Sequence, residues 1–341
     1  MRATLMFGAG DVRVETVADP APQRPTDAVV RVVRSCVCGS DLHPYHSMPA
    51  AEQGRQVGHE FLGIVEQTGA DVATVKAGDL VVASFSYQDN TCEFCRAGVQ
   101  TACAHPEAGF FAGAQAELVR VPLADGTLAK LPVPADSELL PSLLTLADVY
   151  GTGYHAAKKA QVTPGDTVAV IGDGAVGLLA VLSAKQLGAG QIVLMGRHKA
   201  RTDLGVEFGA TDVVAERGEE GIAKVRELTG GGALKVLEAV GHRPAYDQAV
   251  GIVRAGGVIS RVGVPQYDEA PVGRASLFGR NITLNGGPAP VRAYVDELLP
   301  GILDGSVNPG KVFDRTVSIE EVPAAYRAMD DREVLKALIA F

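Results

Sequence analysis

Two rhythms of hydrophobic and polar residues follow one another along the chain. From Thr4 to about Pro134, short runs rich in β-branched residues are separated by turn residues. The clearest runs cover residues 28–34, 61–66, 79–84 and 116–121. Runs of this length and spacing are typical of antiparallel strands. We therefore predict an antiparallel β domain in the first part of the chain.

A different rhythm extends from Asp166 to Val264, where an apolar strand, a glycine-containing turn and an amphipathic helix follow one another repeatedly. The predicted strands cover residues 167–171, 191–195, 212–214, 236–239 and 258–262, with helices such as 175–187 and 244–253 between them. Strands that alternate with helices form right-handed crossovers and a parallel sheet covered on both faces. The predicted fold class is α/β, with a doubly wound parallel sheet in addition to the β domain.

After Pro288 the pattern predicts a helix over residues 291–303, a strand over 314–318 and a helix over 319–329. These elements are too few to form a domain, so we expect them to return to the first one. The predicted domains are residues 1–150 together with 289–341, and residues 151–288.

Composition narrows the possible classes of protein. The 341 residues suffice for about two domains, each with its own core. Hydrophobic residues make up 47% and charged residues 21%, as in a packed globular protein. The net charge of −9 would repel a phosphate backbone, so we expect no nucleic-acid partner.

The apolar stretches and the cysteines indicate the compartment. The longest apolar stretch, residues 175–182, is far shorter than the roughly 18 residues that a membrane helix needs. The first residues turn polar by Asp11 and do not resemble a signal peptide. We expect a cytoplasmic protein that does not bind membranes. An odd number of cysteines in the first third of the chain favours metal ligation over disulfides: Cys36, Cys38, Cys92, Cys95 and Cys103.

A glycine motif between a predicted strand and a predicted helix indicates a dinucleotide site. Gly172, Gly174 and Gly177 form the pattern G-x-G-x-x-G. The first glycine permits the sharp turn, the second lets a pyrophosphate approach the backbone, and the third lets the helix lie close to the sheet. Ala175 and Val176 begin the helix whose N-terminus would attract the phosphates. The alternative is a glycine-rich turn without a ligand.

The end of the next predicted strand bears on the choice of cofactor. Enzymes that use NAD usually have an acid there, about 20 residues beyond the glycines, for the ribose hydroxyls. This chain has Gly196, Arg197 and His198 instead, which favours NADP(H) over NAD(H). Arg201 fits either cofactor, and the basic run could also be a solvated face. We expect Arg197→Ala combined with Gly196→Asp to move the preference towards NAD.

Two short segments suggest a zinc site. One reads Cys38-Gly-Ser-Asp-Leu-His43 and the other Gly58-His59-Glu60. Thiolate and imidazole are common zinc ligands, and a catalytic zinc has three protein ligands and one open position. These segments resemble those of the zinc-dependent medium-chain alcohol dehydrogenase family. The similarity is greatest to its bacterial branch of NADP-dependent secondary alcohol and polyol dehydrogenases.

The resemblance implies a GroES-like antiparallel β catalytic domain and a Rossmann domain, and it covers nearly the whole chain. It also implies that Cys38, His59 and Asp148 hold the catalytic zinc. Glu60 would lie behind the metal as an occasional fourth ligand, and Asp41 would orient His59. The alternative role of Asp148 is that of a helix N-cap.

A second cluster resembles the structural zinc lobe of the same family, at residues 89–103. That lobe has four cysteines spaced C-x2-C-x2-C-x7-C, and Cys92, Cys95 and Cys103 match the last three. Asp89 stands at the first position, where it is a less usual ligand. We expect a structural zinc here, and the alternative is a lobe that folds without metal. Cys36 matches no ligand position and is expected to be a buried neighbour.

The resemblance implies reversible hydride transfer between a nicotinamide and a small alcohol, either a secondary alcohol or a polyol, with a ketone or aldehyde as the product. Ser40 would bond the substrate oxygen, and His43 would pass the proton through the cofactor ribose to water. The alternative for His43 is a surface histidine. The nicotinamide is expected to contact Thr152, Val240, Gly263 and Val264.

The sequence indicates the substrate and the oligomeric state less directly than the chemistry. Four side chains either border the substrate pocket or merely pack: Tyr45, His46, Phe110 and Phe111. A homodimer or homotetramer is expected, with residues 258–262 and 281–285 as candidate interface segments. Two alternative functions are a zinc-free NADPH quinone or enone reductase of the same fold, and a non-catalytic redox sensor that binds the cofactor.

Overall fold

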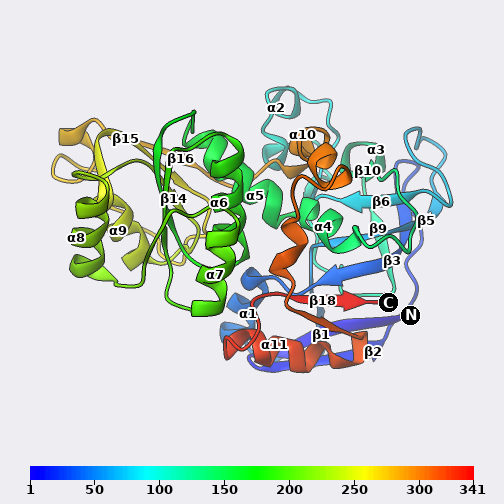
Figure 1. Cartoon of the computed structure of the whole chain (residues 1–341). Helices are drawn as coiled ribbons and strands as arrows, with labels where there is room; N and C mark the ends of the chain where they lie inside the picture. Colours follow the sequence, from blue (N-terminus) through cyan, green and yellow to red (C-terminus); the bar gives the residue numbers. More distant parts are fainter. The chain divides into compact units, whose positions relative to one another are not determined.

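The computed structural model describes all 341 residues and divides them into two compact units (Figure 1). Unit 1 comprises Met1–Gly151 and Pro290–Phe341, and unit 2 comprises Thr152–Ala289. The C-terminal segment therefore completes the unit that the N-terminal segment begins. None of the helices combines the length and the apolar character that crossing a membrane would require.

Unit 1 is built around a sheet of seven strands, six of them in the order β10-β6-β5-β3-β18-β17, while β9 pairs with β3. The pairs are antiparallel except for β17 with β18. The strands are β3 (Ala28–Cys36), β5 (Phe61–Thr68), β6 (Leu80–Ala83), β9 (Leu118–Val121), β10 (Leu128–Lys130), β17 (Arg315–Val317) and β18 (Ala337–Ala340). Valines dominate β3, and Val30 and Val32 lie in a core with Phe61 and Val81. The β-branched runs thus become the buried centre of the sheet.

Smaller elements complete unit 1. A three-stranded sheet consists of β1 (Arg2–Gly8), β2 (Asp11–Thr16) and β4 (Arg55–Gln56), and a two-stranded one of β7 (Ser86–Tyr87) and β8 (Gly109–Phe110). The helices are α1 (Leu42–Ser47), α2 (Glu93–Arg96), α3 (Ala124–Thr127), α4 (Leu140–Leu144), α10 (Val291–Leu303) and α11 (Val322–Asp330). The helix α5 (Val149–Lys159) begins in unit 1 and continues in unit 2.

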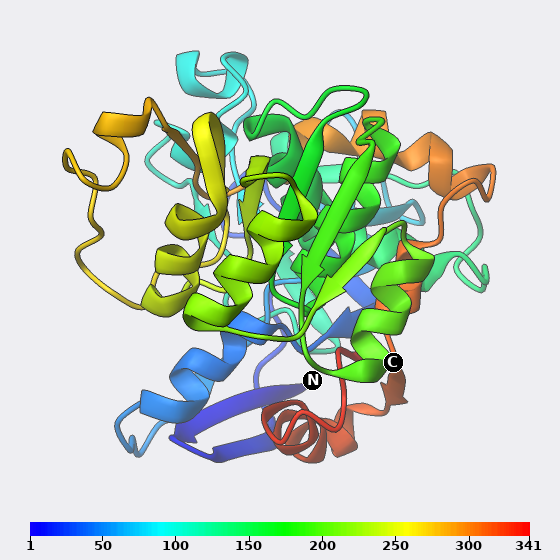
Figure 2. The same ribbon diagram turned by 60° about the vertical axis from the view of Figure 1, so that its left-hand side comes forward.

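Unit 2 contains a parallel sheet of six strands in the order β13-β12-β11-β14-β15-β16. The strands are β11 (Thr167–Ile171), β12 (Gln191–Met195), β13 (Asp212–Val214), β14 (Ala233–Glu238), β15 (Val253–Arg261) and β16 (Thr283–Gly286). Between them lie α6 (Ala175–Gln186), α7 (Lys199–Glu207), α8 (Gly218–Leu228) and α9 (Arg243–Ile252). In Figure 2 the colours of this sheet run from green at β11 to orange at β16, and helices of the same unit pack along it.

The strand order creates a switch point between β11 and β14. From β11 the chain proceeds outward to β12 and β13, and it then returns to β14 on the other side of β11. The helix α6 packs against α7, and α8 packs against α9, as expected when each pair covers one face. Ligands of doubly wound sheets bind at such a switch point, beyond the carboxyl ends of the strands.

The predicted fold class is confirmed, because the chain combines an antiparallel β unit with a doubly wound parallel sheet. The strand β18 was not predicted. It is only four residues long and follows a lysine, so no alternation of apolar and polar residues reveals it. Its position between β3 and β17 depends on pairing with a segment 300 residues earlier in the chain, which local sequence does not encode.

Candidate active site and cofactor site

Four side chains from three separate stretches of unit 1 converge on one point. They are Cys38, His59, Glu60 and Asp148, and one ligand atom of each lies within 4.8 Å of those of the others. Cys38 follows β3, whereas His59 and Glu60 immediately precede β5. Because β3 and β5 are antiparallel neighbours, the end of one strand lies beside the start of the other. Asp148 precedes the helix α5 and supplies the third stretch.

The ring of His59 is held from both sides. Its Nδ1 lies 3.4 Å from Oδ1 of Asp41, and its Nε2 lies 3.3 Å from Oδ2 of Asp148. Asp41 is itself fixed, since its Oδ2 accepts hydrogen bonds from the backbone N–H of Cys38 at 3.0 Å and from Nε2 of Gln115 at 3.2 Å. A carboxylate on Nδ1 leaves Nε2 to face the cluster, as in histidines that bind metals.

Behind the cluster lies a fully buried ion pair. Nζ of Lys336 is 2.7 Å from Oε1 of Glu60, and each side chain is only 1% exposed. The lysine also donates to the carbonyl of Val37 at 3.3 Å. The other carboxylate oxygen of Glu60, Oε2, is buried and makes no hydrogen bond. A buried carboxylate oxygen without a donor costs free energy unless a cation or proton satisfies it.

The donor set fits a zinc ion. Tetrahedral zinc with ligand bonds of 2.0–2.3 Å places its ligand atoms roughly 3.3–3.8 Å apart. Nε2 of His59 lies 3.3 Å from Asp148 and 4.0 Å from Glu60. Burial opposes protonation of His59, but the charges of Cys38 and Asp41 raise its pKa well above the usual range. This preference for a positive charge among anionic donors is the environment that a divalent cation requires.

The predicted proton-transfer residues lie on the segment after Cys38. Ser40 belongs to the short 3₁₀ helix Gly39–Asp41, and His43 belongs to α1; both side chains are half-buried. The carbonyl of His43 accepts a hydrogen bond from Oγ of Ser47 at 2.9 Å. Thr152 lies in unit 2, on α5.

Aromatic side chains differ in their relation to the cluster. Phe85 meets the ring of His59 edge-on at 6.4 Å, and Phe110 stacks on Phe85 at 5.9 Å with 54% of its surface exposed. Phe111 instead packs against Phe61 and Tyr87. Of these two predicted pocket residues, only Phe110 shares surroundings with His59.

The other two pocket candidates lie elsewhere. Tyr45 is buried against Tyr326, with ring centroids 5.5 Å apart. His46 is exposed and pairs with Asp330 at 2.6 Å. Tyr45 is therefore a core residue, and His46 takes part in a surface ion pair.

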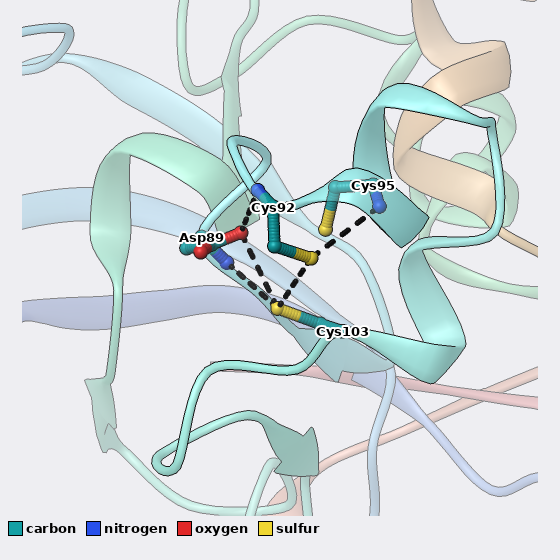
Figure 3. Close-up of side chains that lie close together, drawn as sticks. All are labelled: Asp89, Cys92, Cys95 and Cys103. Atoms are coloured by element: carbon teal, nitrogen blue, oxygen red, sulfur yellow. Dashed lines mark hydrogen bonds between the residues drawn. The ribbon is translucent and has the colours of Figure 1, made fainter.

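The second cluster lies within one short lobe, which Figure 3 shows in close-up. The ligand atoms of Asp89, Cys92, Cys95 and Cys103 lie within 4.8 Å of one another and point towards a common centre (Figure 3). Oδ1 of Asp89 accepts the backbone N–H groups of Thr91 at 2.9 Å and Cys92 at 3.1 Å, and it lies 3.3 Å from Sγ of Cys103. The carboxylate of Asp89 thus completes a group of four potential ligands with the three cysteines.

The charges in this lobe are unequally distributed. Burial disfavours the ionised form of Asp89, yet the N–H groups of Thr91 and Cys92 lower its pKa overall. The N–H groups of Ala104 and Cys95 lower the pKa of Cys92. Burial raises the pKa of Cys95 and that of Cys103. A cation bound between the four groups would reverse that effect, because a coordinated thiol is deprotonated.

In unit 2, the glycine motif forms the turn from β11 to α6. Gly172 has a φ of 115°, a conformation that favours glycine. A Cβ atom on Gly177 would lie 2.0 Å from the carbonyl oxygen of Gly172, so only glycine allows the helix to approach so closely. Gly174 is exposed and has open space where a side chain would be. Ala175 and Val176 follow as the first residues of α6.

The switch point brings further predicted cofactor residues together. A Cβ on Gly172 would lie 2.8 Å from Val240, and one on Gly263 would lie 2.6 Å from the backbone nitrogen of Val240. Val264 follows and is 54% exposed. These residues line the carboxyl edges of β11, β14 and β15, where a dinucleotide binds in this type of sheet.

The predicted specificity segment connects β12 to α7. Gly196 is buried, Arg197 is exposed, and His198 and Arg201 are half-buried. Oδ2 of Asp173, from the glycine turn, accepts the backbone N–H groups of Arg197 at 2.9 Å and His198 at 3.0 Å. The glycine turn and this segment are thus joined through one carboxylate.

Comparisons with known proteins agree with this geometry. Residues 24–133 match the family model of the alcohol dehydrogenase GroES-like domain, and residues 175–300 match that of the zinc-binding dehydrogenases. A probable zinc-binding alcohol dehydrogenase of Mycobacterium tuberculosis is 36% identical over 330 residues, which cover 96% of this chain and 84% of that protein. The chain belongs to the zinc-type medium-chain alcohol dehydrogenase family.

Solved structures of family members extend the agreement to the whole fold. The alcohol dehydrogenase TADH from Thermus sp. ATN1 superposes with a TM-score of 0.91 at 36% identity, and the match covers all of both chains. The apo form of zinc dependent alcohol dehydrogenase 2 from Streptococcus pneumonia gives a TM-score of 0.90 at 30% identity, covering 100% of this chain and 98% of that one. Membership of this family implies a zinc-binding alcohol dehydrogenase with a nicotinamide cofactor.

Sequence reasoning missed three residues that support these sites of the dehydrogenase. Lys336 pairs with Glu60, Gln115 holds Asp41, and Asp173 joins the two loops of unit 2. Lys336 has one local signal, namely a single charge between apolar residues near the C-terminus, and Asp173 has another, namely an acid between two glycines. Gln115 has none, because its role depends on distant partners.

Proposed function

We propose that this alcohol dehydrogenase depends on zinc and prefers NADP(H), and that it interconverts a secondary alcohol or polyol with the corresponding ketone or aldehyde. The convergence of Cys38, His59 and Asp148 carries the proposal, because a thiol, an imidazole and a carboxylate form a three-ligand catalytic site. Residues 151–288 would bind the dinucleotide, and residues 1–150 with 289–341 would bind the substrate.

Cys38, His59 and Asp148 hold the catalytic zinc in this proposal, with Glu60 as an occasional fourth ligand. When bound, zinc supplies the Lewis acidity that lowers the pKa of an alcohol and polarises a carbonyl. Asp41 keeps the proton of His59 on Nδ1, so that Nε2 remains a ligand. Lys336 holds Oε1 of Glu60, the oxygen that lies 4.0 Å from Nε2 of His59.

The chain also provides a path for the proton. Ser40 would hydrogen-bond the substrate oxygen, and His43 would accept the proton that the alcohol loses and release it to water. A histidine suits this role because its ordinary pKa is close to neutral. Both residues follow Cys38 within one helical turn or two, so the metal ligand and both residues of the proton path lie on one short segment.

The cofactor site takes its parts from unit 2. The N-terminus of α6 would hold the pyrophosphate through the residues of the glycine turn: Gly172, Gly174, Ala175, Val176 and Gly177. Arg197, His198 and Arg201, beside Gly196, receive the 2′-phosphate of NADP(H). Thr152, Val240, Gly263 and Val264 would hold the nicotinamide ring.

The lobe is proposed to hold a structural zinc through Cys92, Cys95, Cys103 and Asp89. The close approach of all four ligand atoms supports this assignment. A closed site of this kind stabilises the fold without taking part in chemistry.

We further propose a homodimer or homotetramer. Of the two candidate segments, β15 already pairs on both sides, whereas β16 ends the sheet and leaves one edge open. An open edge is a place where a second copy can continue the sheet. Light scattering of the purified protein would give the subunit number.

A screen of secondary alcohols, polyols and their carbonyl products with NADP and NAD tests the proposed function. We expect turnover that is faster with NADP and that disappears when zinc is removed. Ser40→Ala should keep its zinc by elemental analysis and lose about a hundredfold in kcat. Turnover of enones or quinones by a protein without zinc would contradict the proposal.

A further inference from the structure

An acidic residue lies in the glycine turn that the dinucleotide motif forms. Asp173 stands between Gly172 and Gly174, and its side chain is only 10% exposed. Besides the backbone N–H groups of Arg197 and His198, its Oδ2 contacts Nδ1 of the His198 ring at 2.9 Å. These three donors all belong to the segment after β12, where the cofactor preference is expected to be set.

The side chain of Asp173 also leaves no room for a side chain at position 196. This is the position at the end of β12 where enzymes that use NAD usually have an acidic residue. A Cβ atom on Gly196 would lie 2.6 Å from Cβ and 3.0 Å from Oδ2 of Asp173. Carbon atoms do not approach so closely, so an acid at position 196 and Asp173 exclude each other. This corrects our expectation for Gly196→Asp, which cannot be accommodated while Asp173 stays in place.

The charges around Asp173 indicate what it does for the ligand. Burial opposes ionisation of Asp173, but the ring and backbone N–H of His198 and the backbone N–H of Arg197 stabilise the carboxylate and lower its pKa overall. The negative charge is therefore directed at the backbone and the imidazole. The guanidinium of Arg197 is exposed and forms no ion pair with an acid of the chain, so its charge is available to an anion.

We propose that Asp173 is a specificity-determining residue that positions Arg197 and His198 for the 2′-phosphate of NADP(H) and excludes an acid from position 196. The inference rests on the proposed preference for NADP(H). Asp173 acts through the segment that it anchors, so it is a positioning residue. Its loss weakens binding of NADP more than binding of NAD, because only NADP carries the phosphate that the anchored Arg197 and His198 receive.

Calorimetric titration of the holoenzyme with NADP+ and with NAD+ tests the inference without turnover. We expect Asp173→Ala to weaken NADP+ binding about tenfold and to change NAD+ binding less than twofold. Asp173→Asn keeps the shape of the side chain and removes its charge, so its effect should have the same direction and be smaller. Asp203→Asn is the matched control, because it removes a negative charge from an exposed residue of α7 that pairs only with Lys199.

The two proposals fail in different ways. If the unmodified enzyme binds NAD+ more tightly than NADP+, the proposed NADP preference is wrong, whatever the variants do. If NADP+ is preferred and both Asp173 variants keep the wild-type ratio of the two Kd values, the role of Asp173 is wrong. A ratio that shifts towards NADP+ would also overturn it, since the carboxylate would then repel the phosphate. Melting curves of each variant check that it is folded.

The double variant Asp173→Gly with Gly196→Asp provides a second test. It moves the carboxylate from the glycine turn to the end of β12 and relieves the close contact. We expect the preference to move towards NAD+ by at least tenfold relative to the unmodified enzyme. Gly196→Asp alone should bind both cofactors poorly, and equal behaviour of the single and double variants would contradict the mutual exclusion.

Discussion

The two metal-type clusters of unit 1 contain the same number of potential ligands but arise in different ways. Asp89, Cys92, Cys95 and Cys103 lie within 15 residues of sequence, so a short loop brings them together. Cys38, His59, Glu60 and Asp148 come from segments that are far apart and meet only when the sheet has formed. The lobe cluster is therefore a local structure, whereas the cluster around His59 forms only when the whole domain has folded.

The groups that support the two clusters also differ in how far away in sequence they lie. The lobe satisfies its anionic groups with backbone N–H donors from neighbouring residues, such as Thr91 and Ala104. The other cluster depends on Gln115 and Lys336, which come from remote parts of the chain, and on Asp41, which contacts the ring of the distant His59. A site for chemistry needs such remote supports, because they fix the ligands while one coordination position stays open. We therefore expect the two clusters to respond independently to substitution.

The largest expected effect comes from Cys38→Ala. Loss of this ligand should lower kcat at least about a thousandfold, because the Lewis acid is no longer held at the substrate. Elemental analysis should show zinc falling from two ions per chain to one, since the lobe is unaffected. The control is Cys36→Ala, which alters a buried cysteine outside both clusters. Two zinc ions and normal turnover in Cys38→Ala would eliminate the proposed site.

The next effect concerns the ion pair behind the cluster of Cys38, His59, Glu60 and Asp148. Lys336→Met leaves the charge of Glu60 buried without its partner, so the free energy of unfolding should fall by about 3–5 kcal/mol. Lys199→Met is the matched control, because it breaks an exposed pair with Asp203 and should cost less than about 1 kcal/mol. Denaturant titration measures both. Equal losses in the two variants would show that the buried pair has no special role.

His155 is a buried histidine outside both clusters, and its pKa is shifted in the opposite direction to that of His59. Burial and then the charge of Lys159 lower the pKa of His155 to about 4. The unfolded chain takes up a proton at about pH 6.5 and the folded chain only near pH 4, so stability falls as the pH decreases between these values. The loss should be about 2 kcal/mol from pH 7 to pH 5.

His155→Asn should remove this part of the pH dependence. Denaturant titrations at pH 7 and pH 5 on both proteins give the difference. If the variant loses as much stability as the wild type over this range, His155 does not remain neutral in the folded protein.

The smallest effect is expected from a substitution that gives the lobe a fourth thiol. Asp89→Cys should increase the zinc affinity of the lobe by about tenfold, because thiolates are favoured in closed zinc sites. Competition with a coloured chelator measures the affinity, and kcat should not change. Zinc binding weaker than in the wild type would contradict this expectation. It would mean that the hydrogen bonds that Asp89 accepts from the N–H groups of Thr91 and Cys92 contribute more to zinc affinity than a fourth sulfur does.

The features that could be predicted from the sequence are those that depend on residues close together in the chain. The strands β11, β12 and β13 have the predicted bounds, because each apolar run ends at a glycine or a polar turn. The lobe spacing and the glycine motif are local as well. Lys336, Gln115 and Asp173 were not predicted, since each acts on a residue far away in sequence. Their roles depend on strand pairing and loop contacts, which no local pattern encodes.

The central claim is that Cys38, His59 and Asp148 share one zinc ion. Anomalous diffraction from a crystal of the purified protein, recorded above and below the zinc absorption edge, tests it most directly. We predict a peak bounded by Sγ of Cys38, Nε2 of His59 and a carboxylate oxygen of Asp148, in addition to a peak in the lobe. A fully folded, active enzyme with no peak between these three side chains would contradict the claim.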